Sequence, residues 1–160
     1  MNTVTETTIQ AQDTKTVDYN LEVAIVPVSD VDRAKRFYLS LGWREDVDLP
    51  IRDDFRAVHL TPPGSPASVL FGTGVSVAAP GTARNLLAVS DIEAARADLV
   101  AHGVDVSGIF HGAPGFDVAE LGRVAGVDPD RKSYGSWAQF QDPDGNTWLL
   151  QELTTRLPGR

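Results

Sequence analysis

The stretch IVPVSDVD, residues 25–32, returns 61 positions later as LLAVSDIE, residues 86–93. The same offset pairs residues beyond these stretches: Ala34 with Ala95, Lys35 with Arg96, Tyr38 with Leu99 and Gly42 with Gly103. Because an internal repeat reports on the architecture, the chain is expected to use one supersecondary unit twice.

Each copy begins as a short apolar strand that runs into a helix. Ser29 and Ser90 are expected to cap these helices, with Asp32 and Glu93 completing a capping box three residues later. Apolar residues at helical spacing follow, and a glycine ends each helix.

Strands are expected after both helices, at 43–48, 55–61 and 67–71 in the first copy and at 104–109, 136–141 and 147–152 in the second. The last two strands of each copy are joined by turn-forming sequences, TPPG (residues 61–64) and DPDG (residues 142–145). The sequence therefore predicts an α+β fold of two tandem βαβββ modules, at about 21–72 and 84–153. Together they form a single domain, 19–160, behind a disordered tail, 1–18. Residues 110–134 are extra in the second module, and they form either a lid or a surface insertion.

Composition narrows the class of protein and of partner. The chain has 160 residues, a formal net charge of −8 and no cysteine. Disulfides and thiolate chemistry are excluded, and the scattered Lys and Arg residues speak against nucleic acid and anionic membranes. The start of the chain lacks the pattern of a signal peptide, so a cytoplasmic protein is expected. Acidity favours either a cationic ligand or mere solubility.

The pattern resembles the vicinal oxygen chelate superfamily of glyoxalases, bleomycin-resistance proteins and extradiol dioxygenases. The resemblance rests on VSDVDRAKRFY (residues 28–38) with Leu41 and Gly42, on VSD (residues 89–91), and on FQDPDGN (residues 140–146). It implies that the strands curve around a cavity for a small organic molecule. In many relatives a second subunit completes this cup, so a homodimer is expected.

The resemblance also implies where metal-using relatives place their ligands. Those positions are Val23, Ser68, Arg84 and Leu149 here. Val and Leu have no donor atoms, Arg stays protonated, and a lone Ser cannot hold a divalent ion. We therefore expect neither a metal nor another cofactor.

Strand alternation then gives a set of candidate ligand-binding residues. Gln151 shares the parity of Leu149, while Trp137 and Gln139 face the cup by analogy with the family. Aligning Gly64 with Gly145 places Arg56 and Val58 inward as well and turns His59 towards the helices. His111 joins the site if its long loop folds over the cup. Arg84 in an apolar cup requires an anionic partner, from either the protein or a ligand.

Three functions remain open from the sequence. The first is binding or sequestration of a small organic molecule, as in bleomycin-resistance proteins. The second is a metal-free isomerase, lyase or cyclase that uses Arg84 and an acid or base from the long loop. The third, a metal-dependent glyoxalase or dioxygenase, requires metal ligands from unexpected positions. No catalytic residue is assigned.

Overall fold

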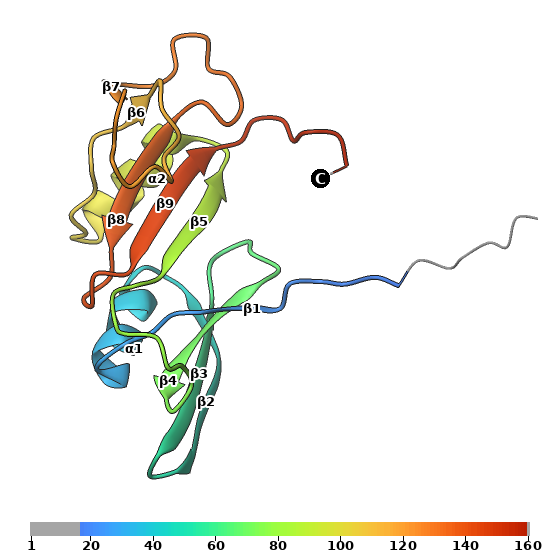
Figure 1. Ribbon diagram of the computed structural model, residues 1–160, viewed down its shortest axis with the longest axis vertical. Helices are drawn as coiled ribbons and strands as arrows, with labels where there is room; N and C mark the ends of the chain where they lie inside the picture. The colour runs from blue at the N-terminus through green and yellow to red at the C-terminus, as the bar shows by residue number, and fades with distance from the viewer. Residues whose placement is uncertain (1–16, 160) are drawn as a thin grey trace, which may run out of the picture.

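The computed structural model describes residues 17–159, which form two mixed β-sheets with one α-helix each (Figure 1). The expected tail, 1–18, lies almost wholly outside the described residues. Neither helix in the described part of the chain has the length and apolar character needed to cross a membrane.

The first module is a four-stranded sheet with the strand order β1-β4-β3-β2. Its elements are β1 (Val23–Ile25), α1 (Val31–Ser40), β2 (Arg44–Arg52), β3 (Phe55–Thr61) and β4 (Ser68–Thr73). Strand β1 is parallel to β4, whereas the pairs β3–β4 and β2–β3 are antiparallel.

The second module repeats this plan with the strand order β5-β9-β8-β6-β7. Its elements are β5 (Arg84–Val89), α2 (Ile92–Ala101), β6 (Phe110–His111), β7 (Val124–Ala125), β8 (Trp137–Gln141) and β9 (Thr147–Glu152). The strand expected at 104–109 is not formed: that segment contributes only one isolated bridge, between Val106 and Phe140, and the two short strands β6 and β7 belong to the insertion. The α+β fold of two βαβββ modules is confirmed.

Both helices begin one residue later than the capping-box pattern predicts. The N-cap residues are Asp30 and Asp91, whose carboxylates accept the backbone N–H groups of Arg33 and Ala94 at 2.9 Å. Ser29 is not the cap, and its hydroxyl donates to Asp144. The glycines that end the helices have φ near +80°, as a left-handed C′ position requires.

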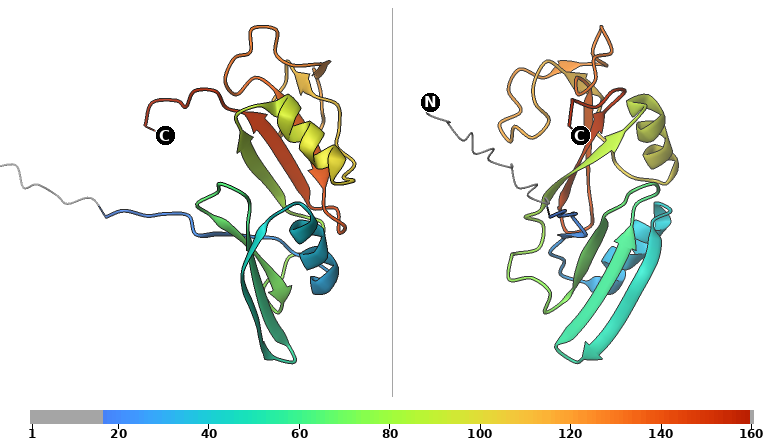
Figure 2. Two further views of the ribbon diagram at one scale, coloured as in Figure 1. Left: turned by 180° about the vertical axis from the view of Figure 1, so that it is seen from behind. Right: turned by 90° about the vertical axis from the view of Figure 1, so that its right-hand side faces the viewer.

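The two helices cover the same side of the two sheets (Figure 2), so the modules share one core. Tyr38 of α1 is fully buried, stacks on Trp43 at 4.7 Å and meets the edge of the Trp148 ring of β9. Trp43 and Trp148 are therefore core residues, as their positions in the sequence predict. This arrangement leaves the opposite side of both sheets free of helices.

Candidate functional site

We call the side of the two sheets that faces away from α1 and α2 the open face. In the first sheet, Val23 pairs with Ser68 and Ile25 with Leu70, and Leu70 pairs in turn with His59. The intervening residues Val69 and Phe71 are buried in the helix-side core. Because side chains alternate along a strand, these pairs lie on the open face.

In the second sheet, three rows of side chains cross the open face. Arg84 pairs with Thr147, Leu86 with Leu149, and Ala88 with Gln151, which pairs in turn with Trp137. Gln139 pairs with Leu149 and completes the middle row. The open-face orientation predicted for Val23, Ser68, Arg84, Leu149, Gln151, Trp137 and Gln139 agrees with this register.

The expected orientation of Arg56 and Val58 is wrong. Val58 is fully buried in the helix-side core, and Arg56 reaches α1. The Arg56 guanidinium donates to Asp48 in a two-pronged pair at 2.9 Å and to Asp32 at 2.8 Å. Hydrogen bonds from Arg56 and then Lys35 hold the pKa of Asp48 well below its usual range. Arg56 thus belongs to a structural ion-pair group outside the cup.

The orientation of Arg56 and Val58 was mispredicted because one hairpin loop is a residue longer than the other. The last open-face pair before each loop is Thr61–Ser68 in the first module and Gln141–Thr147 in the second. Residues 62–67 connect the first pair, whereas the shorter segment 142–146 connects the second. Aligning the two turn glycines therefore shifts β3 by one position, and a shift of one position exchanges the two faces of a strand. His59 corresponds to Gln139 and lies on the open face, where the expectation had turned it away.

The insertion in the second module folds back onto the open face and covers Trp137. The Phe116 ring meets the Trp137 ring edge-on at 5.8 Å between centroids. Gly115 lies directly on the indole, because a Cβ atom added there would be 2.1 Å from Trp137 Cε3. Trp137 is consequently only 4 % exposed. Of the two readings of 110–134, the contacts favour a cover over the cup.

A cavity of about 370 Å³ lies where the insertion meets Trp137. Phe116, Tyr134 and Trp137 supply its aromatic surface, and Pro114 and Asp128 complete its rim. Phe116 was not among the expected lining residues, because no strand parity applies within an irregular insertion.

A cluster of polar side chains, Glu120 and Arg123, links the insertion to Gln139. The Gln139 side-chain amide donates to Glu120 at 3.2 Å, and Glu120 forms an ion pair with Arg123 at 3.1 Å. The Arg123 guanidinium also lies 4.0 Å above the ring of Phe110. Gln139 is therefore partly occupied by protein contacts, and a ligand competes with Glu120 for its amide.

His111 does not point into the cup. Its neighbour Phe110 pairs with Trp137, so alternation turns His111 to the other side of β6. Its Nδ1 lies 2.9 Å from the carbonyl oxygen of Gly126, in the middle of the insertion. His111 was expected to join the site if its loop folded over the cup. The loop does fold over the cup, but the His111 side chain stays outside it.

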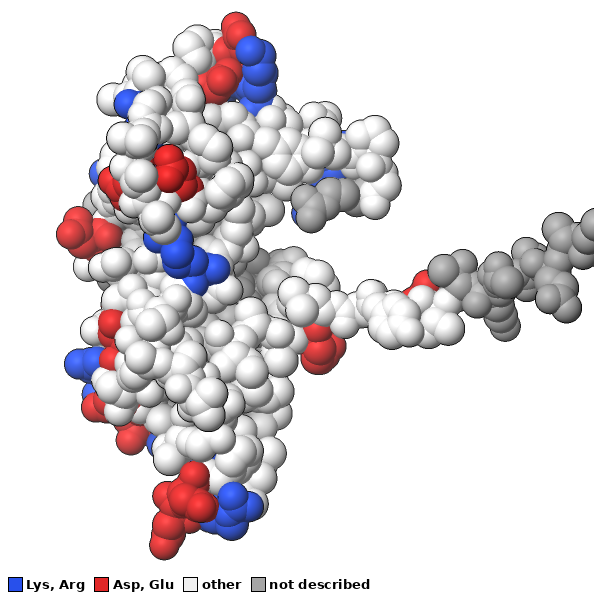
Figure 3. All heavy atoms as spheres, viewed as in Figure 1, with Lys and Arg blue, Asp and Glu red and all other residues white. Residues whose placement is uncertain are grey.

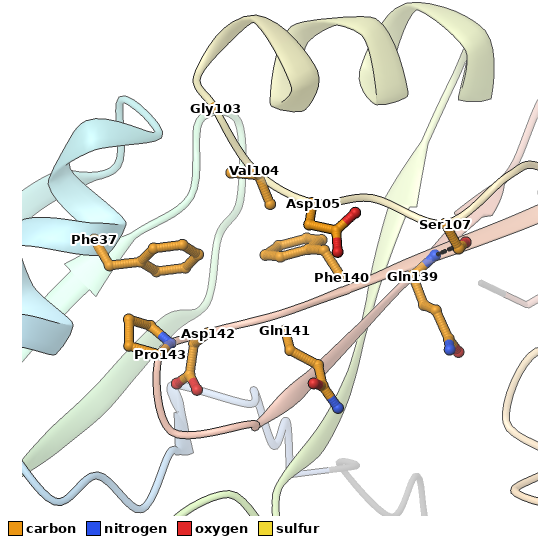
Figure 4. A pocket seen from close by; sticks show the side chains of 10 residues that line it. All are labelled: Phe37, Gly103, Val104, Asp105, Ser107, Gln139, Phe140, Gln141, Asp142 and Pro143. Carbon is orange, nitrogen blue, oxygen red and sulfur yellow. Dashed lines mark hydrogen bonds between the residues drawn. The ribbon is translucent and has the colours of Figure 1, made fainter.

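A larger cavity, of about 530 Å³, opens on the other side of β8 (Figure 4). The rings of Phe37 and Phe140 face one another across it, whereas the side chains of Gln139 and Gln141 point away from these rings. The view illustrates the alternation along β8 that sends the glutamines to the open face. Within residues 17–159, no three His, Asp or Glu side chains gather closely enough to hold a metal ion.

Replacing Gly115 with Ala is expected to lift the insertion from Trp137. The φ of Gly115 is not positive, so the backbone accepts alanine and the cost comes from the clash with the indole. We expect a loss of about 1–3 kcal/mol in the free energy of unfolding and increased acrylamide quenching of tryptophan fluorescence. Trp43 and Trp148 are core residues, so the added quenching reports on Trp137. Gly108→Ala is the control, because a Cβ there meets nothing within 4 Å. Equal behaviour of the two variants would contradict the contact.

Comparison with known proteins decides the family. The profile of the Glyoxalase/Bleomycin resistance protein/Dioxygenase superfamily matches residues 20–150. The chain belongs to this superfamily. The match spans both modules, in agreement with the resemblance carried by the repeat and the DPDGN turn.

Solved structures of superfamily members are similar over most of the chain. TnmS3, an antibiotic binding protein from Streptomyces sp. CB03234, is 28% identical with a TM-score of 0.65, covering 87% of this chain and 99% of its own. A glyoxalase/bleomycin resistance protein from the same organism is 30% identical with a TM-score of 0.61, covering 83% and 100%. A superfamily member from Sphaerobacter thermophilus DSM 20745 is 25% identical with a TM-score of 0.62, covering 84% and 98%. Among curated proteins, none matches the chain.

Proposed function

We propose that this superfamily member binds a flat, largely apolar organic molecule on the open face and releases it unchanged. The observation that carries the proposal is the cavity beside Trp137, which Phe116 and Tyr134 also line. Aromatic walls with few polar groups suit ring systems, because stacked and edge-on contacts add to the burial of apolar area. The exposed side chain of Leu86 extends this apolar surface towards the first module.

The relatives support binding as the mode of action. TnmS3 is an antibiotic binding protein and is similar to this chain over both modules. We therefore propose that the ligand is a bulky natural product of antibiotic size and that the protein sequesters it.

We propose that binding needs no metal. The argument is the chemistry of the four side chains at the family's ligand positions, which lie on the open face as expected. Ser68 alone carries an oxygen, and its hydroxyl is hydrogen-bonded to Thr61 at 2.7 Å. If a stoichiometric divalent ion were found in purified protein and ligand affinity were lost on chelation, this part would be overturned.

We also propose that two copies associate through their open faces. Ile25, Leu49 and Leu86 lie on this face and are 47%, 51% and 45% exposed, which is high for apolar side chains on sheet strands. A second subunit would cover them and close the cup. Light scattering is expected to give twice the mass of the chain at micromolar concentration, and a monomer there would contradict the dimer.

The test of binding uses N-phenyl-1-naphthylamine, a neutral aromatic probe that fluoresces in apolar sites, followed by aromatic antibiotics that displace it. Trp137→Ala should weaken probe binding at least about tenfold, because a central aromatic contact contributes more than 1.4 kcal/mol. Trp137→Phe should retain most of the affinity. Mass spectrometry of the recovered antibiotic decides between binding and catalysis, since a converted product would overturn sequestration.

A further inference from the structure

Arg84 stands at the centre of the open face, where the two modules meet. The residue before it, Ala83, donates its N–H to Asn146, and the Asn146 side chain donates to the carbonyl of Pro27, just after β1. The start of β5 and the end of β1 are therefore joined through one side chain. Arg84 is exposed there and shares the open face with Leu86 and Leu149.

Arg84 differs from most of the described cations in having no hydrogen-bonded or ion-pair partner. Ion pairs with carboxylates engage Arg33, Lys35, Arg44, Arg52, Arg56, Arg123, Arg131 and Lys132. Arg96 donates to the carbonyl of Ser107. Among the Lys and Arg side chains that the structure describes, three have neither an ion pair nor a hydrogen bond: Arg36, Arg84 and Arg156. Of these, only Arg84 is a strand residue on the open face.

The carboxylates that contact open-face side chains already have partners of their own. Asp46 accepts from Arg44 at 2.6 Å and from the hydroxyl of Thr61. Glu120 is paired with Arg123 and with Gln139. Although the whole chain carries a net charge of −8, neither of these two carboxylates is free to pair with Arg84. Figure 3 shows the charged side chains scattered over the surface in that view, with no large patch of either sign.

We propose that the ligand of the open face is an acid, and that Arg84 binds its anionic oxygen. The inference rests on the proposed binding function. A bound ligand, or the second subunit, removes water from Arg84, and a desolvated guanidinium needs a charged partner. Carboxylate, sulfonate and ionised phenol or enol groups all accept its paired N–H donors. The exposed side chain of Leu86, in the row next to Arg84, supplies surface for the apolar body of the same molecule.

The test compares two probes with one aromatic body. 1-Anilinonaphthalene-8-sulfonate carries an anionic sulfonate, and N-phenyl-1-naphthylamine lacks it. Fluorescence titration is expected to give the sulfonate probe about tenfold higher affinity at low salt, because a hydrogen bond to a charged group contributes more than 1.4 kcal/mol. Arg84→Gln should remove this advantage and leave the affinity for the neutral probe unchanged. Arg84→Lys should keep part of it.

Arg36→Gln is the matched control, since Arg36 is equally exposed and unpaired among the described residues but lies on α1. It should bind both probes like the parent protein. Raising the ionic strength should reduce the sulfonate preference, as for any partly exposed charge pair. Equal affinities of the parent protein for both probes, or a preference that survives Arg84→Gln, would overturn the role of Arg84 while the binding function stands. If neither probe bound, the proposed function itself would fail.

Discussion

Replacing Tyr38 with Ala is expected to lower the free energy of unfolding by about 3–5 kcal/mol. The side chain is fully buried, and its ring contacts Trp43, Phe71 and Trp148 at centroid distances of 4.7, 5.7 and 6.0 Å. No other helix residue joins so many aromatic rings of both modules. Truncation removes these contacts and leaves a cavity that rigid sheet strands cannot fill.

The hydroxyl of Tyr38 separates the two contributions to this loss. It donates to Asp142 at 2.8 Å and accepts from the indole N–H of Trp148 at 3.0 Å. Burial, and then the nearby Asp142 carboxylate, raises the pKa of Tyr38 well above its usual range, so the phenol stays protonated and remains a donor. Tyr38→Phe keeps the ring and should cost about 1–3 kcal/mol, because two buried polar groups lose a partner. Urea unfolding followed by circular dichroism measures both values. Equal losses for the two variants would show that packing contributes nothing, contrary to the expectation.

Replacing Asn146 with Ala is expected to lower the free energy of unfolding by about 2–4 kcal/mol. Asn146 is fully buried in the turn before β9. Its side chain accepts the N–H of Ala83 at 3.0 Å and donates to the carbonyl of Pro27 and to Asp142, both at 2.8 Å. Alanine would leave the N–H and the carbonyl at the junction of the modules without partners.

Asn85→Ala is the matched control for this experiment. Asn85 is the second residue of β5, and its side-chain nitrogen is buried without a hydrogen-bond partner. Its removal should change the free energy of unfolding by less than about 1 kcal/mol, because relief of the buried unpaired N–H donor offsets the lost packing of the side chain. Thermal unfolding of the Asn146→Ala variant should remain a single transition, because the modules still share the core around Tyr38. An Asn85 variant as unstable as the Asn146 variant would contradict the assigned hydrogen bonds.

Local patterns in the sequence predicted the fold well. The repeated strand and helix, the closing glycines at positions 42 and 103, and the turn DPDG each depend on neighbours within a few residues. The helix caps show that such local patterns locate the start of a helix to within one residue. The sequence pattern placed the caps at Ser29 and Ser90, whereas the structure places both one residue later, at Asp30 and Asp91.

The orientation of the candidate residues was predicted in part, because side chains alternate along a strand and one reference position fixes all the others. The four positions at which metal-using relatives place ligands, Val23, Ser68, Arg84 and Leu149, lie on the open face. The orientations that were inferred for β3 by alignment with β8 were wrong, because the loop 62–67 is one residue longer than its counterpart 142–146. That single residue turned Arg56 to the helix side and His59 to the open face. The register of β3 is seen only in its pairing with β4, for example of Thr61 with Ser68. The apolar pattern of β3 is compatible with either register, so the local sequence does not determine it.

The repeat IVPVSDVD and LLAVSDIE is sufficient to predict two strand-and-helix units, since helix caps, apolar periodicity and turn residues act over short distances along the chain. Which side chains lie on the open face, and what covers them, depends on tertiary structure. The cover over Trp137 requires an irregular insertion to return to its own sheet, and whether Arg84 meets a carboxylate depends on how strands far apart in the sequence are packed. Both are long-range outcomes of packing and charge pairing, which no local pattern contains.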